Sequence, residues 1–322
     1  MPQSAGTEPA GGSTEITSRS LRASGHNRRV AQPGLSQRAL VSRDAPALQA
    51  LVRRCLDTDG GLPDAASEPF IGRQYLGGPG AGWFADGGLV AAAALGAERD
   101  GRVTASGAVS PGFRGRGLGR RLFGWTVAAA GGAPLLITAE SVGESAMRLY
   151  ARLGLREVFA ELVMSAGLAE LPQATRSAID LPAGLELRAW TADLAPAFFA
   201  AYDGAFRDRP GFPGWSERDW LARTTQDDGF APALCRLAVD GAGDPAGFQI
   251  ISANWIAQMG VVPRWRQCGI GNALLAAAMS GIATAGFKTC WLTVATNNPA
   301  AIRLYRRAGF AEAGRRARYE LG

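Results

Sequence analysis

Histidine and lysine are almost absent from this chain of 322 residues. His26 is the single histidine and Lys288 the single lysine. Because His26 lies in a tail of Ser, Gly, Thr and Arg, we expect no Ser-His-Asp triad, no Cys-His pair, no histidine metal site and no bound metal. The phosphate-binding loop of nucleotide hydrolases needs Gly-Lys-Ser/Thr, and Lys288 does not stand in that pattern.

Paired cysteines and long apolar runs are also lacking. The spacing of Cys55, Cys235, Cys268 and Cys290 is not typical of a zinc site or a disulfide framework. No run reaches the ~18 apolar residues of a membrane span, and the N-terminus lacks a charged and then apolar signal region. We therefore expect a cytoplasmic protein that does not bind membranes.

Basic residues are numerous but not clustered. The net charge of +6 comes from 34 Lys and Arg against 28 Asp and Glu residues. The arginines are scattered, whereas nucleic-acid binding favours basic residues gathered on one face with aromatic residues between them. We expect no nucleic-acid partner, although a basic surface would help to draw in an anionic cofactor.

A glycine turn joins an apolar strand to a helix in the second half of the chain. The strand ends at Pro263, which cannot continue a ladder, and a helix begins directly after Gly269 and Gly271. Unpaired N–H groups at a helix start bind phosphate, and Arg266 adds a cation with bidentate geometry. The dinucleotide fingerprint would need a third glycine where Leu274 stands.

A second polar helix start follows this turn. Asn298 and Pro299 have the order of an N-cap and a first helical proline, and Gly309 stands where a left-handed C-cap would end the helix. Tyr305 lies two turns beyond Asn298, so both side chains face one side of a helix of about ten residues. We expect the amide and the phenol to look back toward the phosphate turn.

The Arg-x-x-Gly-x-Gly turn and the Asn-x-x-Ala-x-x-x-Tyr helix, in this order, resemble the GNAT superfamily of acyl-CoA-dependent N-acyltransferases. The resemblance implies an α/β fold with a mixed sheet, acetyl-CoA as co-substrate, and a diphosphate held by the turn. It also implies that pantetheine pairs with the strand before the turn and that Tyr305 is the catalytic acid for the leaving thiolate. The residues implied in cofactor binding are Met259, Gly260, Val261, Arg266, Gln267, Cys268, Gly269, Ile270, Gly271, Asn272 and Asn298.

The same pattern occurs earlier in the chain. Residues 109–119 match residues 261–271 with an offset of 152, and Tyr150 corresponds to Tyr305 with an offset of 155. Seven residues before Tyr150 stands Gly143, so this first copy lacks the capping amide. The repeat predicts two tandem GNAT acyltransferase domains, of which the second is the catalytic one.

Composition sets the expected boundaries. Residues 1–36, rich in Gly, Ser, Pro and Arg, are expected to form a disordered tail. Residues 37–169 are the non-catalytic N-terminal domain, 170–184 the linker, and 185–322 the catalytic C-terminal domain. The first copy either still binds CoA or is a packing partner with an empty turn. The residues that would bind CoA there are Arg114, Gly115, Gly117 and Gly119.

The expected activity is acyl transfer from acetyl-CoA to the primary amine of a small molecule, by direct attack on the thioester. The alternative is a non-catalytic acyl-CoA-binding or interaction module. Backbone N–H groups of residues 259–261 are candidate donors to the oxyanion. The general base stays open among Asp203, Asp208, a water held by Asn254 or Gln258, and the C-terminal carboxylate. We expect a monomer or a homodimer.

Within the superfamily the chain resembles tandem enzymes of the mycothiol synthase type in length, order and an active-looking second copy. A mycothiol-synthase-like activity is therefore a further alternative. Where those enzymes have an acceptor-binding acid and a tyrosine, this chain has Trp255 and Thr293. These departures indicate a different acceptor, such as an aminoglycoside-like or amino-acid-derived amine.

Overall fold

The structure is a computed structural model that describes residues 34–99, 101–169, 181–209 and 212–321. The predicted disordered tail lies outside the described residues up to residue 33, and the predicted linker lies outside them up to residue 180. All elements below belong to the unit that begins at Leu35. No helix within these described ranges is long and apolar enough to cross a membrane.

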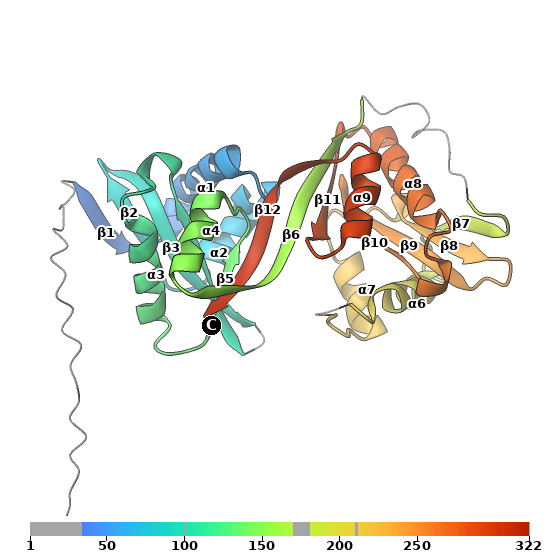
Figure 1. Ribbon diagram of the computed structural model, residues 1–322, viewed down its shortest axis with the longest axis horizontal. Coiled ribbons are helices and arrows are strands. Elements are labelled where there is room, and N and C mark those ends of the chain that lie inside the picture. Colours follow the sequence, from blue (N-terminus) through green and yellow to red (C-terminus); the bar gives the residue numbers. More distant parts are fainter. Residues whose placement is uncertain (1–33, 100, 170–180, 210–211, 322) are drawn as a thin grey trace, which may run out of the picture. The chain divides into compact units, whose positions relative to one another are not determined.

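One order of elements occurs twice along the chain (Figure 1). The first copy consists of β1 (Leu35–Ala39), η1 (Ser42–Asp44), α1 (Ala45–Asp59), η2 (Pro63–Ala66), α2 (Glu68–Tyr75), β2 (Gly80–Ala85), β3 (Gly88–Arg99), β4 (Arg102–Val109), η3 (Pro111–Phe113), α3 (Leu118–Ala129), β5 (Leu135–Ala139), α4 (Glu144–Arg152) and β6 (Leu155–Gly167). The second consists of β7 (Leu185–Ala189), α6 (Ala195–Phe206), α7 (Glu217–Thr225), η4 (Pro232–Leu234), β8 (Arg236–Asp240), β9 (Pro245–Ser252), β10 (Trp255–Val261), η5 (Pro263–Trp265), α8 (Ile270–Thr284), β11 (Thr289–Ala295), α9 (Pro299–Arg307) and β12 (Ala311–Leu321).

The local sequence accounts for these elements. Leu48, Leu51 and Val52, whose spacing is that of one helix face, are buried on α1. Asp86, with a φ of 49°, and Gly87 form the turn between β2 and β3. Helix α8 has 15 residues and α3 has 12, and this difference explains why the offset between the copies grows from 152 to 155.

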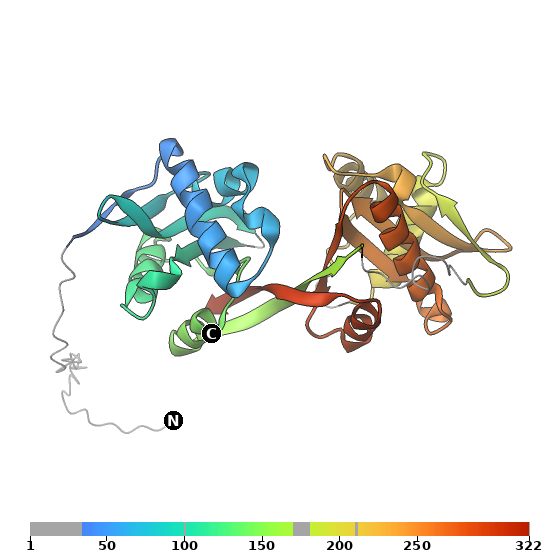
Figure 2. The same cartoon turned by 90° about the horizontal axis from the view of Figure 1, so that it is seen from above.

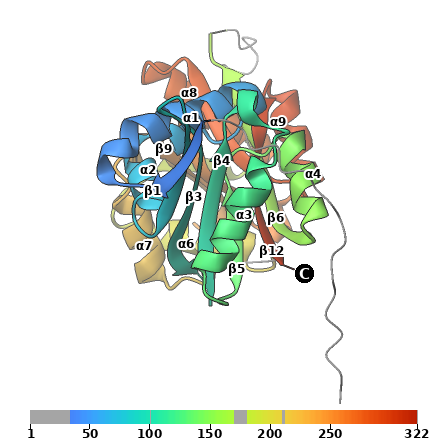
Figure 3. The ribbon, with the colours of Figure 1, turned by 90° about the vertical axis from the view of Figure 1, so that its left-hand side faces the viewer.

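The described strands form one twelve-stranded sheet in the order β1-β2-β3-β4-β5-β12-β6-β11-β10-β9-β8-β7. Strand β4 pairs with β5, and β10 with β11, in parallel; the other neighbours are antiparallel. In the first copy, α1 and α2 cover one face of the strands, and α3 and α4 cover the other (Figure 3). The predicted mixed α/β class is confirmed.

The final strand of each copy lies beside strands of the other copy. Strand β6 lies between β12 and β11, and β12, at the end of the chain, lies between β5 and β6. Figures 1 and 2 show β6 and β12 running side by side between the two groups of strands. The linear division at residues 170–184 does not describe this exchange, because each parallel pair is flanked by a strand from the other copy.

Gly314 marks the closest approach of β12 to the first copy. A bulge between Glu312 and Gly314 interrupts the pairing with β6, and Gly314 has a φ of 146°. A Cβ atom on Gly314 would lie 1.9 Å from the backbone nitrogen of Gly61 and 2.4 Å from the carbonyl carbon of Gly60. Only glycine therefore fits where the exchanged strand crosses the turn after α1.

We predict that Gly314→Ala destabilises the protein by roughly 3 kcal/mol or more, because the methyl group must displace backbone atoms. Gly124→Ala is the matched control, since Gly124 lies inside α3 with no atom within 4 Å of the added Cβ. Alanine there should stabilise the protein by about 0.5–1 kcal/mol. Urea unfolding followed by tryptophan fluorescence measures both; an unchanged midpoint for Gly314→Ala would contradict the packing of β12.

Candidate active site

The predicted phosphate turn of the second copy is open to a ligand. Gly269, with a φ of 88°, leads from η5 into α8, and Gln267 has a φ of 64°. That region costs a non-glycine residue about 1–2 kcal/mol. In the described part of the chain, the N–H groups of residues 267–271 donate to no protein acceptor, whereas that of Asn272 donates to the Gly269 carbonyl at 3.0 Å. The turn thus presents five free donors at the positive end of α8, which suits phosphate groups.

Arg266 fixes the end of β10 against α6. Its Nε donates to the Val261 carbonyl at 3.2 Å, and its Nη2 donates to the Ala205 carbonyl at 3.1 Å. Gly260 allows this approach, because a Cβ there would lie 2.7 Å from the Cβ of Ala205. Both partners of the guanidinium are neutral, so its positive charge stays available to an anion beside the turn. Its direct contact with a diphosphate stays a prediction.

The parallel strands β10 and β11 pair over only two residues each. The paired residues are Trp255 with Trp291 and Ile256 with Leu292. Ala257 then forms a bulge against β9, and a bulge turns a strand away from its neighbour. Beyond this point no ladder pair joins the described residues of the two strands, and this unpaired stretch between β10 and β11 is called the gap.

Backbone directions decide which predicted amide donors face this gap. The Val262 N–H donates to the Ala246 carbonyl on β9 at 3.0 Å. Because N–H directions alternate along an antiparallel ladder, the N–H of Gly260 also points toward β9. The N–H groups of Met259 and Val261 point the other way, into the gap. Two of the three predicted oxyanion donors therefore face β11, and their contact with a thioester stays a prediction.

Helix α9 has the predicted caps, but the side chains of Asn298 and Tyr305 lie in different environments. Asn298 is exposed, and its Oδ1 accepts the N–H of Ala301 at 3.1 Å. Tyr305 is only 7% exposed and packs against Phe310, with ring centroids 5.9 Å apart. The Asn298 side chain thus caps the helix, while the Tyr305 ring belongs to the core between α9 and β11.

Burial changes the acidity of Tyr305. It raises the pKa of the phenol to about 12, with a further contribution from the nearby Cys290 thiol. A thiol has a pKa of about 8.5, so full proton transfer from this phenol to a thiolate is uphill by on the order of 5 kcal/mol. In this environment Tyr305 is better suited to donate a hydrogen bond to the leaving sulfur than to give up its proton completely.

The first copy keeps the same turn but neutralises its arginine. Gly115 and Gly117 have φ values of 74° and 82°, matching Gln267 and Gly269. Arg114 again caps its strand, donating from Nε to the backbone carbonyl at the end of β4 at 3.2 Å. Its Nη1 and Nη2 donate to the two carboxylate oxygens of an aspartate, Asp59, at 2.9 and 2.6 Å. This turn therefore lacks the uncompensated charge of the second copy.

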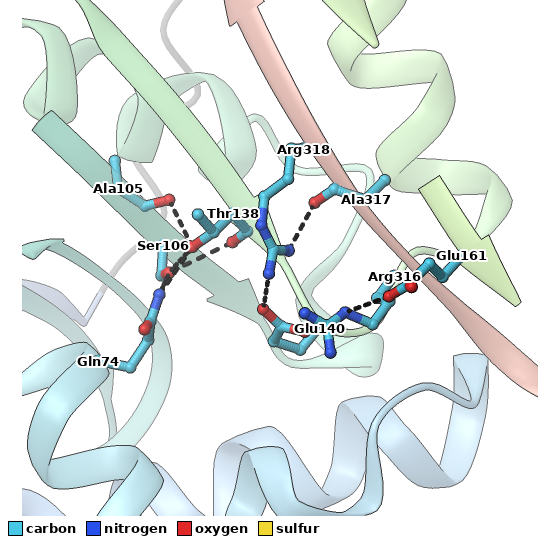
Figure 4. Close-up of polar contacts among 9 residues, drawn as sticks. All are labelled: Gln74, Ala105, Ser106, Thr138, Glu140, Glu161, Arg316, Ala317 and Arg318. Atoms are coloured by element: carbon cyan, nitrogen blue, oxygen red, sulfur yellow. Dashed lines mark hydrogen bonds and ion pairs between the residues drawn. The ribbon is translucent and has the colours of Figure 1, made fainter. Parts of the chain in front are cut away.

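A cavity of about 730 Å³ passes between β4 and β5 of the first copy, and a cluster of polar side chains crosses it. The Gln74 amide on α2 donates to the hydroxyl of Ser106 and, at 2.7 Å, to that of Thr138, and the two hydroxyls lie 2.7 Å apart (Figure 4). This cluster ties β4 to β5 where they begin to diverge. The register places Gln258 and Thr293 at the positions of Ser106 and Thr138.

Strand β12 brings two arginines to Glu140, a residue that lines that cavity. Arg318 donates to Glu140 at 2.8 Å, and the Nε of Arg316 lies 3.0 Å from the other Glu140 oxygen and 3.5 Å from Glu161 (Figure 4). Burial lowers the pKa of Arg318, while Glu140 opposes that change. Two arginines and two glutamates from β12, β5 and β6 thus compensate one another where the exchanged strands meet.

The structure separates the candidates for the general base. Asp203, on α6, forms an ion pair with an arginine one turn further on, while Asp208 is exposed. The Asn254 amide donates to the backbone of β11 at 2.9 Å. Gln258 accepts a hydrogen bond from α7 at 3.0 Å. Residue 322 lies outside the described residues, and Leu321 pairs with β6 in the first copy.

The comparison with known proteins identifies the family. Residues 49–155 and 187–310 match the Acetyltransferase (GNAT) family. The chain belongs to this family. GNAT acetyltransferases use acetyl-CoA as co-substrate, and the predicted enzyme class, N-acetyltransferase, is confirmed.

Several known proteins are similar to this chain over most of its length. Mycothiol acetyltransferase of Clavibacter michiganensis subsp. michiganensis is 35% identical over 69% of this chain and 73% of that protein. The protein of the same name from Tsukamurella paurometabola is 31% identical over 86% and 96%, respectively. A GCN5-related N-acetyltransferase from Sphaerobacter thermophilus superposes with a TM-score of 0.73 at 29% identity, over 89% of this chain and 96% of that one. A tandem GNAT protein from the clavulanic acid biosynthesis pathway shares the fold, with a TM-score of 0.60 at 19% identity over 89% and 99%.

Sequence reasoning missed the side chains that distinguish the two GNAT copies. The cluster formed by Gln74, Ser106 and Thr138 joins three separate elements, and Asp59 reaches Arg114 across 55 positions of sequence. No local sequence motif predicts these contacts, because their partners are far apart in the sequence. Ser106 corresponds to Gln258 in the repeat, and this difference between the copies is the signal that could have pointed to these contacts.

We predict that Tyr305 stays protonated well above neutral pH. Its pKa in the fold, about 12, lies above the value of about 10 in an unfolded chain. Its contribution to stability is therefore complete below pH 10 and falls as the pH rises, by about 1.4 kcal/mol at pH 11. Tyr305→Phe should lose correspondingly less stability than wild type between pH 9 and 11, measured by urea unfolding. Equal losses would contradict the raised pKa.

Proposed function

We propose that the second copy is the catalytic centre and transfers an acetyl group from acetyl-CoA to the primary amine of a small molecule. The amine nitrogen attacks the thioester carbon, the carbonyl oxygen becomes an oxyanion, and the carbon–sulfur bond then breaks. The observation that carries this proposal is the gap between β10 and β11. It is lined by two outward N–H groups, of Met259 and Val261, and it adjoins the free amides of residues 267–271.

The contrast between the copies supports this assignment. Gln74 ties the diverging strands together in the first copy. In the second copy, Thr293 makes no hydrogen bond through its hydroxyl to any residue in the described ranges, so no such tie crosses the gap. An extended pantetheine arm needs that space, because it pairs with the strand edge as a further strand would.

The first copy has a different proposed role. Its turn, with Arg114, Gly115, Gly117 and Gly119, borders the cavity of about 730 Å³. We propose that it binds the diphosphate end of CoA without acetyl transfer. The free amides there favour phosphate, while the Gln74 cluster occupies the place of the thioester.

Two candidates stand for the amine that accepts the acetyl group. The names of the relatives make the amine of a mycothiol precursor the first candidate. The second is a different small amine, favoured by Trp255 and Trp291. Their rings stack at 5.6 Å beside the gap, where the related enzymes are expected to place an acid.

Protection of Cys268 tests cofactor binding in the second copy. Cys268 is the exposed one of the four cysteines and lies among the free amides. Bound acetyl-CoA should slow its alkylation by iodoacetamide at least tenfold, measured by mass spectrometry. Undiminished alkylation at saturating acetyl-CoA would place the diphosphate elsewhere.

The matched reporter for the first copy is Arg116→Cys in a Cys268→Ser background, because residue 116 corresponds to residue 268. We expect protection there too, by CoA as well as by acetyl-CoA. Alkylation at residue 116 that CoA does not slow would contradict binding in the first copy and leave the second-copy assignment intact.

We predict that Tyr305→Phe lowers kcat by about 10–100-fold, because a hydrogen bond to the leaving thiolate is lost. The KM for acetyl-CoA should change little, since Tyr305 is buried in the core and is not one of the turn residues that present free amides. Tyr150→Phe, the corresponding change in the first copy, is the control and should leave kcat unchanged. If both variants turn over like wild type, Tyr305 has no role in the transfer.

A further inference from the structure

The side chain of Gln258 is held in one orientation by α7. The Nε1 of Trp220 donates to its Oε1 at 3.0 Å. Trp220 is completely buried and packs against the rings of Tyr202 and Phe248, at centroid distances of 5.1 and 6.3 Å. A tryptophan fixed in this way is a rigid anchor for the amide that it contacts.

The chemistry of the indole determines which end of the amide is free. An indole N–H can only donate, so it must meet the oxygen of Gln258 and not the nitrogen. The NH2 group is then directed away from Trp220. Within the ranges that the structure describes, it donates to no protein acceptor.

Gln258 lies at the narrow end of the gap, where the pairing of β10 with β11 ends. Gln258 directly follows the bulge at Ala257, and the last pair between β10 and β11 is Ile256 with Leu292. The next residue, Met259, has its backbone N–H directed into the gap. Strand β10 thus carries a side-chain donor and a backbone donor on adjacent residues, directly after its last pair with β11.

We propose that Gln258 is a catalytic residue, whose side-chain NH2 binds the thioester oxygen together with the backbone N–H of Met259, and that Trp220 is a positioning residue. The inference rests on the proposed function of the second copy. As the amine attacks the carbonyl carbon, the π electrons move to oxygen, and two preorganised donors stabilise the charge. When the oxyanion collapses, the carbon–sulfur bond breaks, the thiolate leaves, and the surplus proton of the amine passes to solvent.

Within its described residues, the first copy has no side-chain donor equivalent to the NH2 group of Gln258. Ser106 occupies the position of Gln258, and its hydroxyl is already engaged by Gln74 and Thr138 (Figure 4). No free donor remains at that position. In the second copy, the Oε1 of Gln258 is occupied by Trp220, and only its NH2 group is free. Because this group donates hydrogen bonds and cannot accept a proton, Gln258 is not suited to hold a water that acts as the general base.

The decisive measurement uses acetyl-CoA itself as the probe. In infrared difference spectra of [1-¹³C]acetyl-CoA bound to the full chain, the carbonyl band should lie at lower wavenumber with wild type than with Gln258→Leu, because a hydrogen bond weakens the C=O bond. The same frequency in both would overturn the proposal. Gln226→Leu, at the exposed end of α7, is the control and should match wild type.

Kinetics give a second test, with ethanolamine as the probe amine. Gln258→Leu should lower kcat by about 10²–10³-fold with little change in the KM for acetyl-CoA. Trp220→Phe, which keeps the ring but removes the N–H, should cause a smaller loss and add nothing to Gln258→Leu, since it acts through Gln258. A kcat of Gln258→Leu within threefold of wild type would overturn the proposal.

Gln258→Glu separates a catalytic from a merely structural role. Its carboxylate still accepts from Trp220, but a negative oxygen then faces the developing oxyanion. The ratio of variant to wild-type kcat should rise as the pH falls and the acid gains a proton that it can donate; a ratio independent of pH would contradict the proposal. If acetyl-CoA fails to protect Cys268 in wild type, the proposed function itself has failed, which is a different outcome.

Discussion

The structure depends on keeping two neighbouring parallel strands apart. Unpaired backbone N–H groups inside a protein are costly, so a sheet tends to close such a gap. In the second copy the bulge at Ala257 turns β10 aside, and Arg266 ties the end of the strand to α6. Gly260 lets α6 come close enough for that tie. These contacts hold open the donors that a thioester and its diphosphate can satisfy.

The exchange of the final strands β6 and β12 holds the strand on the other side of each gap in place. Strand β11 shares seven paired residues with β6 but only two with β10. The strand on one side of the gap is therefore anchored by the first copy more firmly than by its own. Strand β12 does the same for β5, and the charges of Arg316 and Arg318 are compensated at that junction by those of Glu140 and Glu161. Each copy therefore completes the sheet of the other.

The sequence predicted what local chemistry determines, and little beyond it. The caps at Asn298 and Gly309 and the turn at Gly269 follow from conformational preferences of single residues, and the structure has all three. The strand exchange was not predictable, because β6 and β12 read alike as closing antiparallel strands and nothing in either names its partner. The acidity of Tyr305 was missed for a related reason: the ordinary pKa of a phenol holds in water, and burial is a property of the fold.

The two copies differ in how an amide side chain is bonded beside the parallel strands. In the first, an amide on α2 donates hydrogen bonds to hydroxyls on both strands and so bridges β4 and β5. In the second, the amide of Gln258 is on the strand, and the partner on α7 is the indole of Trp220, which can only donate. Reversing the positions of amide and partner turns a cluster that satisfies itself into one with a donor to spare. Because a spare donor beside a gap stabilises developing negative charge, this exchange of residue types supports the proposal that the second copy is the catalytic one.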